Sequence, residues 1–227
     1  MGKLLGRAAG PEGDSVVVIG MGRFGQSVAT SLVQLGHEVL GIDEDAGLVQ
    51  EMSGVLTHVV QANTTTVETL RQLNVASYAH AVVAIGTDLE ASILSVLALS
   101  ELGVKDIWAK AVNERHARIL ERTGAHHVVQ PEKRMGERVA HLVTSKLLDY
   151  IEFDDEFAIA QAHAPQETIG KSLAESAVRQ AFNVTVVGIK RRGEDFTYGR
   201  PETIVKHGDV LIIAGKIRDV QAFAGQS

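Results

Sequence analysis

The glycine-rich segment at residues 20–25, with the spacing G-x-G-x-x-G, constrains the fold of this chain more than any other feature. It follows the β-branched run Val16–Ile19 and opens a helical pattern, so it predicts a strand, a tight turn and a helix in that order. In such a turn Gly20 permits the sharp bend, Gly22 lets backbone amides approach a pyrophosphate, and Gly25 lets the helix pack on the strand. The segment therefore predicts a unit that binds phosphate at a helix N-terminus.

Asp43 and Arg23 indicate which nucleotide this turn would hold. Asp43 follows Gly25 by 18 positions, at the end of the second predicted strand. A carboxylate there accepts hydrogen bonds from both ribose hydroxyls and repels a 2′-phosphate, which favours an adenine nucleotide without that phosphate over NADP. Arg23 is a cation that the terminal phosphates of ATP or ADP could use. Structural alternatives stay open: the glycines could tighten a packed crossover, Asp43 could cap the next helix, and Arg23 could be solvated.

Strand-like and helix-like stretches alternate along the first 130 residues. The strand-like runs are apolar on successive positions, as expected when helices cover both faces of a sheet. They predict an α/β domain with a Rossmann-like, doubly wound parallel sheet and right-handed crossovers. The expected strands are 16–19, 38–42, 58–61, 79–85, 107–111 and 127–130, and the expected helices are 23–35, 46–52, 67–73, 89–102 and 114–123.

Ligands of open α/β sheets bind at the carboxyl ends of the strands. We therefore predict further binding residues at the carboxyl ends of the third, fourth and fifth strands. Ordinary loop chemistry or helix capping is the alternative for each of them. These residues are Asn63, Thr64, Ile85, Gly86, Thr87, Lys110, Ala111 and Val112.

The region after residue 130 predicts a second, smaller domain. A helix is expected from Glu132 to about Tyr150, and the acidic cluster 152–156 marks a boundary in the pattern. We expect a flexible tail at 1–13, a nucleotide-binding domain at 14–131, a crossover helix and linker at 132–152, and a small α+β domain at 153–227. Within that last domain the expected strands are 157–162, 184–190 and 210–214, and the expected helices are 173–182 and 218–223.

Composition excludes several classes of function. The 227 residues carry a formal net charge of −6, which argues against a nucleic-acid binder because such proteins need a basic surface. The chain has no cysteine, so disulfides, thiolate nucleophiles and cysteine-bound metals are excluded. No segment is apolar enough over sufficient length to predict a membrane span. We expect a soluble, cytoplasmic protein that would reach a membrane only through a partner.

The sequence shows no catalytic constellation. Nine histidines are present, but His126 and His127 are expected to be a surface or packing pair, and no hydrolase elbow, P-loop or zinc-protease motif occurs. We therefore expect no enzymatic activity and a nucleotide that acts as a signal. Two alternatives stay open: an NAD(H)-dependent redox sensor or oxidoreductase, and an assembly protein whose nucleotide is purely structural.

An ordered set of segments resembles the RCK (regulator of potassium conductance) or KTN family, and is most similar to the cytosolic regulatory subunits of Ktr/Trk-type bacterial potassium uptake systems. The resemblance over about residues 14–150 is carried by VVVIGMGRFGQSVATSLVQLGHEVLGID, QANTT, AVVAIGTDLEASILSVLALSELGV, IWAKAVNERHARILERTGA and VVQPEKRMG. The later segments IGKSLAES, VTVVGIKR and GDVLIIAG resemble the small C-terminal domain of the family.

This resemblance implies a homodimer built through a crossover helix, and dimers assembled into an octameric ring beneath an integral-membrane potassium channel subunit. It implies that ATP and ADP compete for one site, that ATP favours the conducting state, and that NAD(H) is a further ligand. Some relatives bind cyclic di-AMP between paired C-terminal domains. Arg179 and Asn183 stand at plausible positions for that ligand, but Ala177 replaces an acidic residue often found there, which favours a structural turn.

Residue by residue, the resemblance implies that Arg23 contacts the terminal phosphates and that Asp43 holds the ribose. It adds His116 to the pocket and assigns Glu132 to a divalent cation, Mg²⁺ or Ca²⁺, near the phosphates; a first-turn carboxylate stabilised by the helix dipole is the alternative for Glu132. The full set of candidate ligand-binding residues is Gly20, Met21, Gly22, Arg23, Phe24, Gly25, Asp43, Glu44, Asp45, Asn63, Thr64, Ile85, Gly86, Thr87, Lys110, Ala111, Val112, His116 and Glu132.

Overall fold

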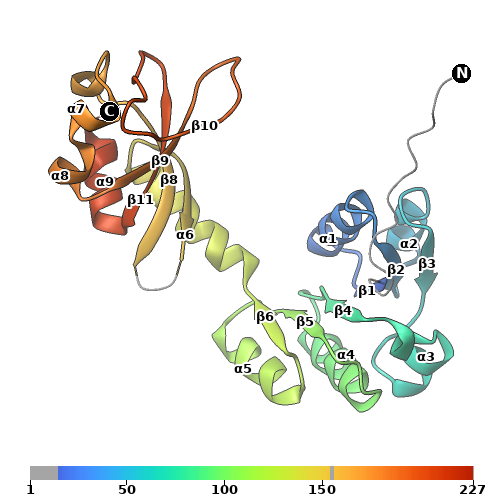
Figure 1. The fold of residues 1–227 in the computed structure, drawn as a ribbon. Helices are drawn as coiled ribbons and strands as arrows, with labels where there is room; N and C mark the ends of the chain where they lie inside the picture. The colour runs from blue at the N-terminus through green and yellow to red at the C-terminus, as the bar shows by residue number, and fades with distance from the viewer. Residues whose placement is uncertain (1–14, 154–155, 227) are drawn as a thin grey trace, which may run out of the picture. The chain divides into compact units, whose positions relative to one another are not determined.

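The computed structural model describes residues 15–153 and 156–226. They fall into two compact units that divide after Glu132 (Figure 1). The tail expected at 1–13 lies outside the described residues, and so do positions 154 and 155 of the acidic cluster. Within the described ranges, no helix combines the length and the apolar character needed to cross a membrane.

The first unit contains a parallel sheet with the strand order β3-β2-β1-β4-β5-β6, which confirms the doubly wound α/β prediction. The strand order reverses between β1 and β4, and open α/β sheets bind ligands at such a switch point. The strands are β1 (Ser15–Ile19), β2 (Glu38–Asp43), β3 (His58–Gln61), β4 (His80–Val83), β5 (Ile107–Lys110) and β6 (His127–Val129). The helices are α1 (Arg23–Gln34), α2 (Ala46–Met52), α3 (Val67–Gln72), α4 (Leu89–Glu101) and α5 (Glu114–Thr123), with a 3₁₀ turn at Val75–Ser77.

Two apolar cores explain why successive residues of the strands are apolar. Val16 and Val18 of β1 pack in one core with residues of α1 and α2, whereas Val17 and Ile19 pack in the other with residues of α3, α4 and α5. Figure 1 shows the first pair of helices above the strands and the other three below. Because both faces of the sheet are covered, the four successive residues Val16–Ile19 of β1 are all buried.

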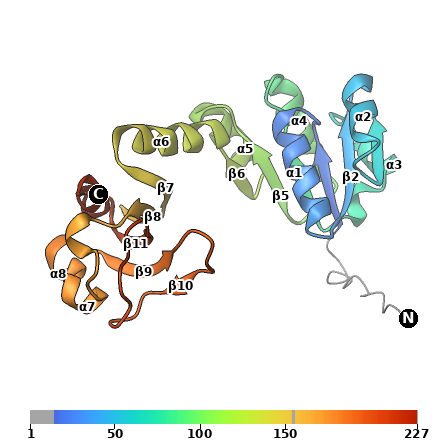
Figure 2. The same cartoon turned by 90° about the horizontal axis from the view of Figure 1, so that it is seen from above.

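The second unit is built on an antiparallel sheet with the strand order β10-β9-β11-β8-β7, whose neighbouring strands can be followed in Figure 2. Its core contains Phe223, which is fully buried and makes an edge contact with Phe182. The strands are β7 (Leu147–Glu152), β8 (Phe157–His163), β9 (Thr185–Lys190), β10 (Thr197–Tyr198) and β11 (Val210–Lys216). The helices are α6 (Pro131–Thr144), α7 (Leu173–Ser176), α8 (Val178–Phe182) and α9 (Ile217–Gly225), with a 3₁₀ turn at Gln166–Thr168.

The predicted helix from Glu132 to Tyr150 is wrong in its second half. α6 ends at Thr144, and residues 147–152 form β7, which pairs with β8. The buried residues of β7, Leu147 and Tyr150, are three positions apart because the strand register shifts between Leu147 and Asp149. In the sequence, Leu147 and Leu148 follow Leu142 and Val143 at helical spacing, so the pattern alone favoured the wrong element.

The predicted helix 173–182 is interrupted, and the two-residue strand β10 was not predicted. Ala177 separates α7 from α8 with a φ of 50°, although neither glycine nor proline marks the break. Asn183 ends α8 with a φ of 56°, and its side-chain amide donates to Asp219 Oδ2 at 2.9 Å. These contacts fit the structural turn that was the alternative to a cyclic di-AMP contact.

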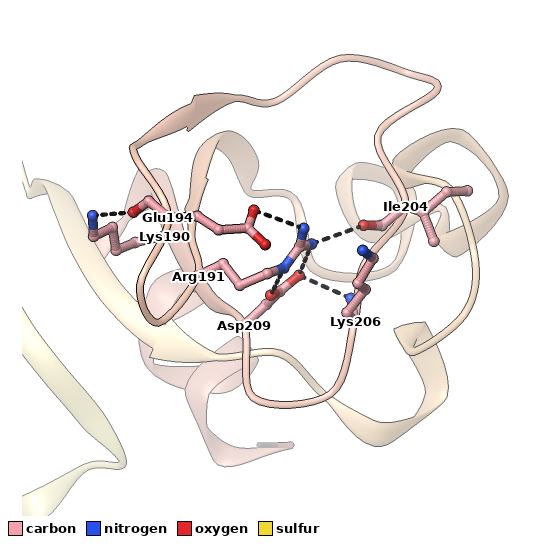
Figure 3. Close-up of polar contacts among 6 residues, drawn as sticks. All are labelled: Lys190, Arg191, Glu194, Ile204, Lys206 and Asp209. Carbon is pink, nitrogen blue, oxygen red and sulfur yellow. Dashed lines mark hydrogen bonds and ion pairs between the residues drawn. The ribbon is translucent and has the colours of Figure 1, made fainter.

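A buried ion pair joins β9 to the turn before β11 (Figure 3). Arg191 donates from Nε to Asp209 Oδ1 at 2.7 Å and from Nη2 to Oδ2 at 2.8 Å, and the backbone N–H of Lys206 donates to the same Oδ2 at 2.8 Å. Burial would raise the pKa of the Asp209 carboxyl, but the Arg191 guanidinium and the Lys206 amide outweigh it and hold the pKa below its ordinary value. The pair therefore stabilises the second unit in its charged form.

Candidate nucleotide-binding site

The glycine turn is shaped by two of its three glycines. Gly20 has a φ of +94°, and its N–H donates to Ile42 O at 2.8 Å. A Cβ atom on Gly25 would lie 1.8 Å from Gly20 O, so only glycine allows α1 to pack this closely on the turn. Gly22 differs, because a Cβ atom there would have no described atom within 4 Å. Packing of the chain therefore does not explain Gly22.

Among the residues that the structure describes, no side chain caps the N-terminus of α1. Its N-cap residue is Gly22, whereas α2, α3, α4 and α5 are each capped by a side-chain oxygen that accepts from first-turn N–H groups. Those capping residues are Asp45, Thr66, Asp88 and Asn113. The first N–H groups of α1 thus remain available to an anion at the switch point of the sheet.

Asp43 lies at the end of β2 and is tied to the glycine turn. Its Oδ2 accepts from the Met21 N–H at 2.5 Å and its Oδ1 accepts from the Asp45 N–H at 2.8 Å. Asp43 does not cap the next helix, which was its structural alternative. Asp45 caps that helix, because its Oδ1 accepts from the N–H groups of Gly47 and Leu48. Each Asp43 oxygen keeps a further lone pair for a ribose hydroxyl. Glu44 is exposed beside it.

A cationic group faces the same edge of the sheet. Lys110, the last residue of β5, places Nζ 2.6 Å from Glu132 Oε1 and 5.7 Å from the ring centre of Phe24. The hydrogen bond from Lys110 lowers the pKa of the Glu132 carboxyl, and the charges of Lys110 and Arg23 add to the effect. Arg23 is exposed in the first turn of α1. Positive charge from the first turn of α1 and from the end of β5 is therefore present at this edge.

The ends of β4 and β5 complete this edge. Ile85 lies against Gly20, because a Cβ atom on Gly20 would be 3.0 Å from Ile85 Cγ1. A Cβ atom on Gly86 would lie 3.1 Å from Lys110 Nζ and 3.6 Å from Val112 Cγ1. Thr87 is exposed, and Ala111 is buried with its N–H bonded to Val129 O. The structure thus brings the residues predicted after β1, β2, β4 and β5 to one edge.

Two predicted residues, Asn63 and Thr64, make local or buried contacts instead of facing that edge. Asn63 accepts from the N–H and the hydroxyl of Thr65. Thr64 is 5% exposed, and its hydroxyl lies 2.7 Å from Ser95 Oγ of α4. Ser95 was not predicted, although two serines, Ser92 and Ser95, within an otherwise apolar stretch were an available signal. The alternative that Asn63 or Thr64 caps α3 is wrong, since Thr66 does so.

His116 is buried in the first turn of α5. Its Nδ1 accepts from the Val112 N–H at 3.4 Å, and its Nε2 has no hydrogen-bond partner among the residues that the structure describes. Burial lowers the pKa of His116, so the ring is neutral at physiological pH. It offers a donor at Nε2 close to the edge but no charge.

The histidine pair at 126–127 lies at the opposite, amino end of the strands. His127 stacks on Trp108 with ring centres 4.1 Å apart and lies 3.2 Å from Asp106, which also contacts His80 at 2.6 Å. His126 Nδ1 accepts from the Ile107 N–H. Both histidines therefore have packing contacts, as expected. The described residues hold no cluster of three side chains suited to a metal ion.

Comparison with known proteins identifies the family. The chain matches the TrkA-N domain over residues 16–131 and the TrkA-C domain over residues 163–225. It is 36% identical over 210 residues to Ktr system potassium uptake protein A of Bacillus subtilis (strain 168), an alignment that covers 92% of this chain and 95% of the relative. The chain belongs to the RCK family. It is also 35% identical over 207 residues to Ktr system potassium uptake protein C of that organism, with 91% and 94% coverage.

Solved RCK structures share the fold. The GsuK RCK domain aligns with a TM-score of 0.66 at 19% identity, and the GsuK channel bound to NAD aligns with a TM-score of 0.66 at 18% identity. Each alignment covers 96% of this chain but only 49% and 40% of the respective GsuK chain. This RCK chain thus spans about half or less of those proteins, and the likeness shows a common fold.

Proposed function

We propose that this chain is a cytoplasmic nucleotide-sensing subunit that regulates a membrane potassium channel or transporter, and that it binds ATP and ADP at the carboxyl edge of the first sheet. The observation that carries the proposal is the convergence of the uncapped α1 N-terminus, the Asp43 carboxylate and the cations Arg23 and Lys110 at that edge. The names of the two Bacillus relatives, which match over more than nine-tenths of this chain, support potassium uptake as the process.

Each group at the edge has a chemical part in this proposal. The first N–H groups of α1 receive the phosphates next to Gly22, where a side chain would occupy the same open space. Asp43 accepts from the ribose hydroxyls with the lone pairs that its two backbone contacts leave. Arg23 and Lys110 neutralise the terminal phosphates, with Arg23 suited to a bidentate contact.

The nucleotide acts here as a signal. ATP and ADP can switch the protein only if they bind two conformations with different relative affinities. The γ-phosphate adds charge and acceptors next to Arg23 and Lys110, so it is the group that can make this difference. No chemical step on the nucleotide is part of the proposal, and the chain is proposed not to be an enzyme.

In this proposal, α6 pairs two copies of the chain. Met135, Val139 and Val143 repeat every four residues along α6, and their side chains are 52%, 47% and 79% exposed. Such a stripe suits helix pairing with a second copy of the chain. We propose a homodimer through α6 and a ring of dimers, an octamer, that contacts the membrane subunit. The protein would then be peripheral to the inner face of the membrane.

A divalent cation, Mg²⁺ or Ca²⁺, is proposed to join Glu132 to the phosphates. Glu132 is one carboxylate beside the proposed phosphate position, and Mg²⁺ is commonly held by one or two carboxylates together with substrate phosphates. When bound, the cation would offset phosphate charge. The protein's own part is to supply the Glu132 carboxylate.

NAD(H) is the second candidate ligand, and redox sensing the second candidate function. One observation favours it: a solved structure that shares the fold is the GsuK channel bound to NAD. The Asp43 carboxylate suits the ribose of NAD as well as that of ATP. Selective binding of NADH over ATP and ADP would favour this alternative.

Deletion of the gene in its host tests the proposed function. We expect the deletion strain to take up potassium several-fold more slowly at limiting external potassium, because the membrane subunit would lack its regulator. Uptake of rubidium, a potassium tracer, measures the rate. A plasmid copy of the wild-type gene should restore uptake, and a copy encoding Gly22→Ala should not. Unchanged uptake in the deletion strain would contradict the proposal.

A further inference from the structure

The ion pair between Lys110 and Glu132 is asymmetric. Nζ and Oε1 are 2.6 Å apart, yet the Lys110 side chain is 12% exposed whereas that of Glu132 is 68% exposed. A nearly buried ammonium needs a counter-charge, because the desolvated charge is costly without one. An exposed carboxylate has no such need, because water can replace its partner at small cost.

The surroundings of Lys110 hold its ammonium in place. Its Nζ lies 5.7 Å from the centre of the Phe24 ring, in the first turn of α1. On the other side, Gly86 leaves the room that the ammonium occupies, since a Cβ atom there would come within 3.1 Å of Nζ. The ammonium is therefore fixed between the glycine turn and the end of β4, while its carboxylate partner is able to leave.

We propose that Glu132 is an internal competitor of the ligand's phosphate: it neutralises Lys110 in the nucleotide-free protein, and a phosphate group displaces it. This inference rests on the proposed function, because it requires phosphate at the carboxyl edge. The carboxylate and the phosphate are both anions with oxygens that accept from one ammonium, so they exclude each other at Lys110. The exposed Glu132 is the partner that moves.

The displacement reaches α6 through the chain itself. Glu132 is the second residue of α6, which begins at Pro131 and continues into the second unit. While Glu132 holds Lys110, the first turn of α6 is tethered to the end of β5. When phosphate takes Lys110, that tether is lost, and the carboxylate becomes free for another partner, such as a cation. Phosphate binding thus controls the start of the helix that carries the proposed dimer stripe.

The variant Glu132→Gln tests the competition. The full chain is titrated calorimetrically with ADP and with adenosine in the presence of a chelator, so that no divalent cation contributes. We expect ADP to bind about fivefold more tightly to the variant, as the loss of a partly exposed competing ion pair implies, and adenosine to bind equally to both proteins. Glu137→Gln, which removes an exposed charge from the same helix, should leave both affinities unchanged.

The outcomes separate the two proposals. If the parent binds ADP and Glu132→Gln binds it equally or more weakly, the proposed competition is overturned. The proposed function then still stands. Failure of the parent to bind ADP overturns both. As a second readout, amide hydrogen exchange in the second turn of α6, whose N–H groups bond to the carbonyls of the first turn, should rise when ADP binds the parent and should already be raised in Glu132→Gln. Unchanged exchange on ADP binding also overturns the proposed coupling.

Discussion

Replacing Gly25 with alanine is expected to unfold the first unit at temperatures where the parent protein stays folded. The added Cβ atom would lie 1.8 Å from Gly20 O and 2.9 Å from Gly20 C, both of them backbone atoms. Gly20 cannot retreat, because its N–H is bonded to Ile42 in the neighbouring strand. Overpacking commonly costs about 1–3 kcal/mol, and a clash with fixed backbone belongs at or above the upper end, so we expect a loss of about 3 kcal/mol or more.

Gly22→Ala is the matched control within the same turn. Gly22 has a φ of −68°, which alanine adopts readily, and its Cβ atom would meet no described atom within 4 Å. We expect the free energy of unfolding to change by less than about 0.5 kcal/mol. ADP affinity should nevertheless fall by about tenfold or more, because the methyl group occupies the space proposed for phosphate.

Thermal denaturation followed by circular dichroism, with calorimetric ADP titration, separates the two effects. A Gly25→Ala protein with the parent's melting temperature would contradict the packing of the turn. A Gly22→Ala protein that binds ADP like the parent would contradict the placement of phosphate at this helix.

Asp209→Ala should destabilise the second unit by about 3 kcal/mol. The substitution removes a fully buried carboxylate and leaves the Arg191 guanidinium and the Lys206 N–H without their partner. Breaking a buried pair typically costs about 3–5 kcal/mol, and the 25% exposure of Arg191 places this pair at the low end, since water can reach the guanidinium. Glu194→Ala removes a second contact of the same arginine, but Glu194 is 55% exposed, so we expect a loss below about 1 kcal/mol.

The ion pair between Asp209 and Arg191 also makes the stability of the second unit depend on pH. The pKa of this carboxyl in the folded protein lies below its ordinary value of 3.8, so the folded state favours the charged form. The stabilisation is fully present above the ordinary pKa and is lost as pH falls through the folded-state pKa. Urea denaturation at pH 7 and at about pH 3 should therefore show a smaller difference between parent and Asp209→Ala at the acidic pH. An equal difference at both pH values would contradict this role of Asp209.

The first unit could be predicted well because its signals are local. Each signal affects residues only a few positions away along the chain. These signals are the glycine turn, the strands that are apolar on both faces, and the capping residues Asp45, Thr66, Asp88 and Asn113. Leu147 and Leu148 were misread, because they continue the helical spacing of Leu142 and Val143, whereas in β7 the strand register shifts after Leu147. That shift depends on pairing with β8, which no local pattern contains.

The candidate site likewise has one part that could be predicted from the sequence and one part that could not. The approach of Met21 to Asp43 follows from the spacing of the turn and the second strand, and the sequence predicted it as a shared site. The contact between Lys110 and Glu132 joins the end of β5 to the first turn of α6, and the contact between Thr64 and Ser95 depends on how α4 packs. Both depend on how distant elements pack, so spacing along the chain could name the residues but not their partners.

Calorimetric titration of the nucleotide-free protein and of its Arg23→Ala variant with ATP and ADP tests the proposed switch most directly. We expect the parent to bind both nucleotides with different affinities and to bind NADPH weakly, because Asp43 repels a 2′-phosphate. Arg23→Ala should narrow the difference between ATP and ADP by about tenfold and leave adenosine binding unchanged, since one charge-assisted contact to phosphate is lost. ATP and ADP binding to the parent with the same affinity and the same enthalpy, or tight binding of NADH alone, would contradict nucleotide sensing by an ATP/ADP switch.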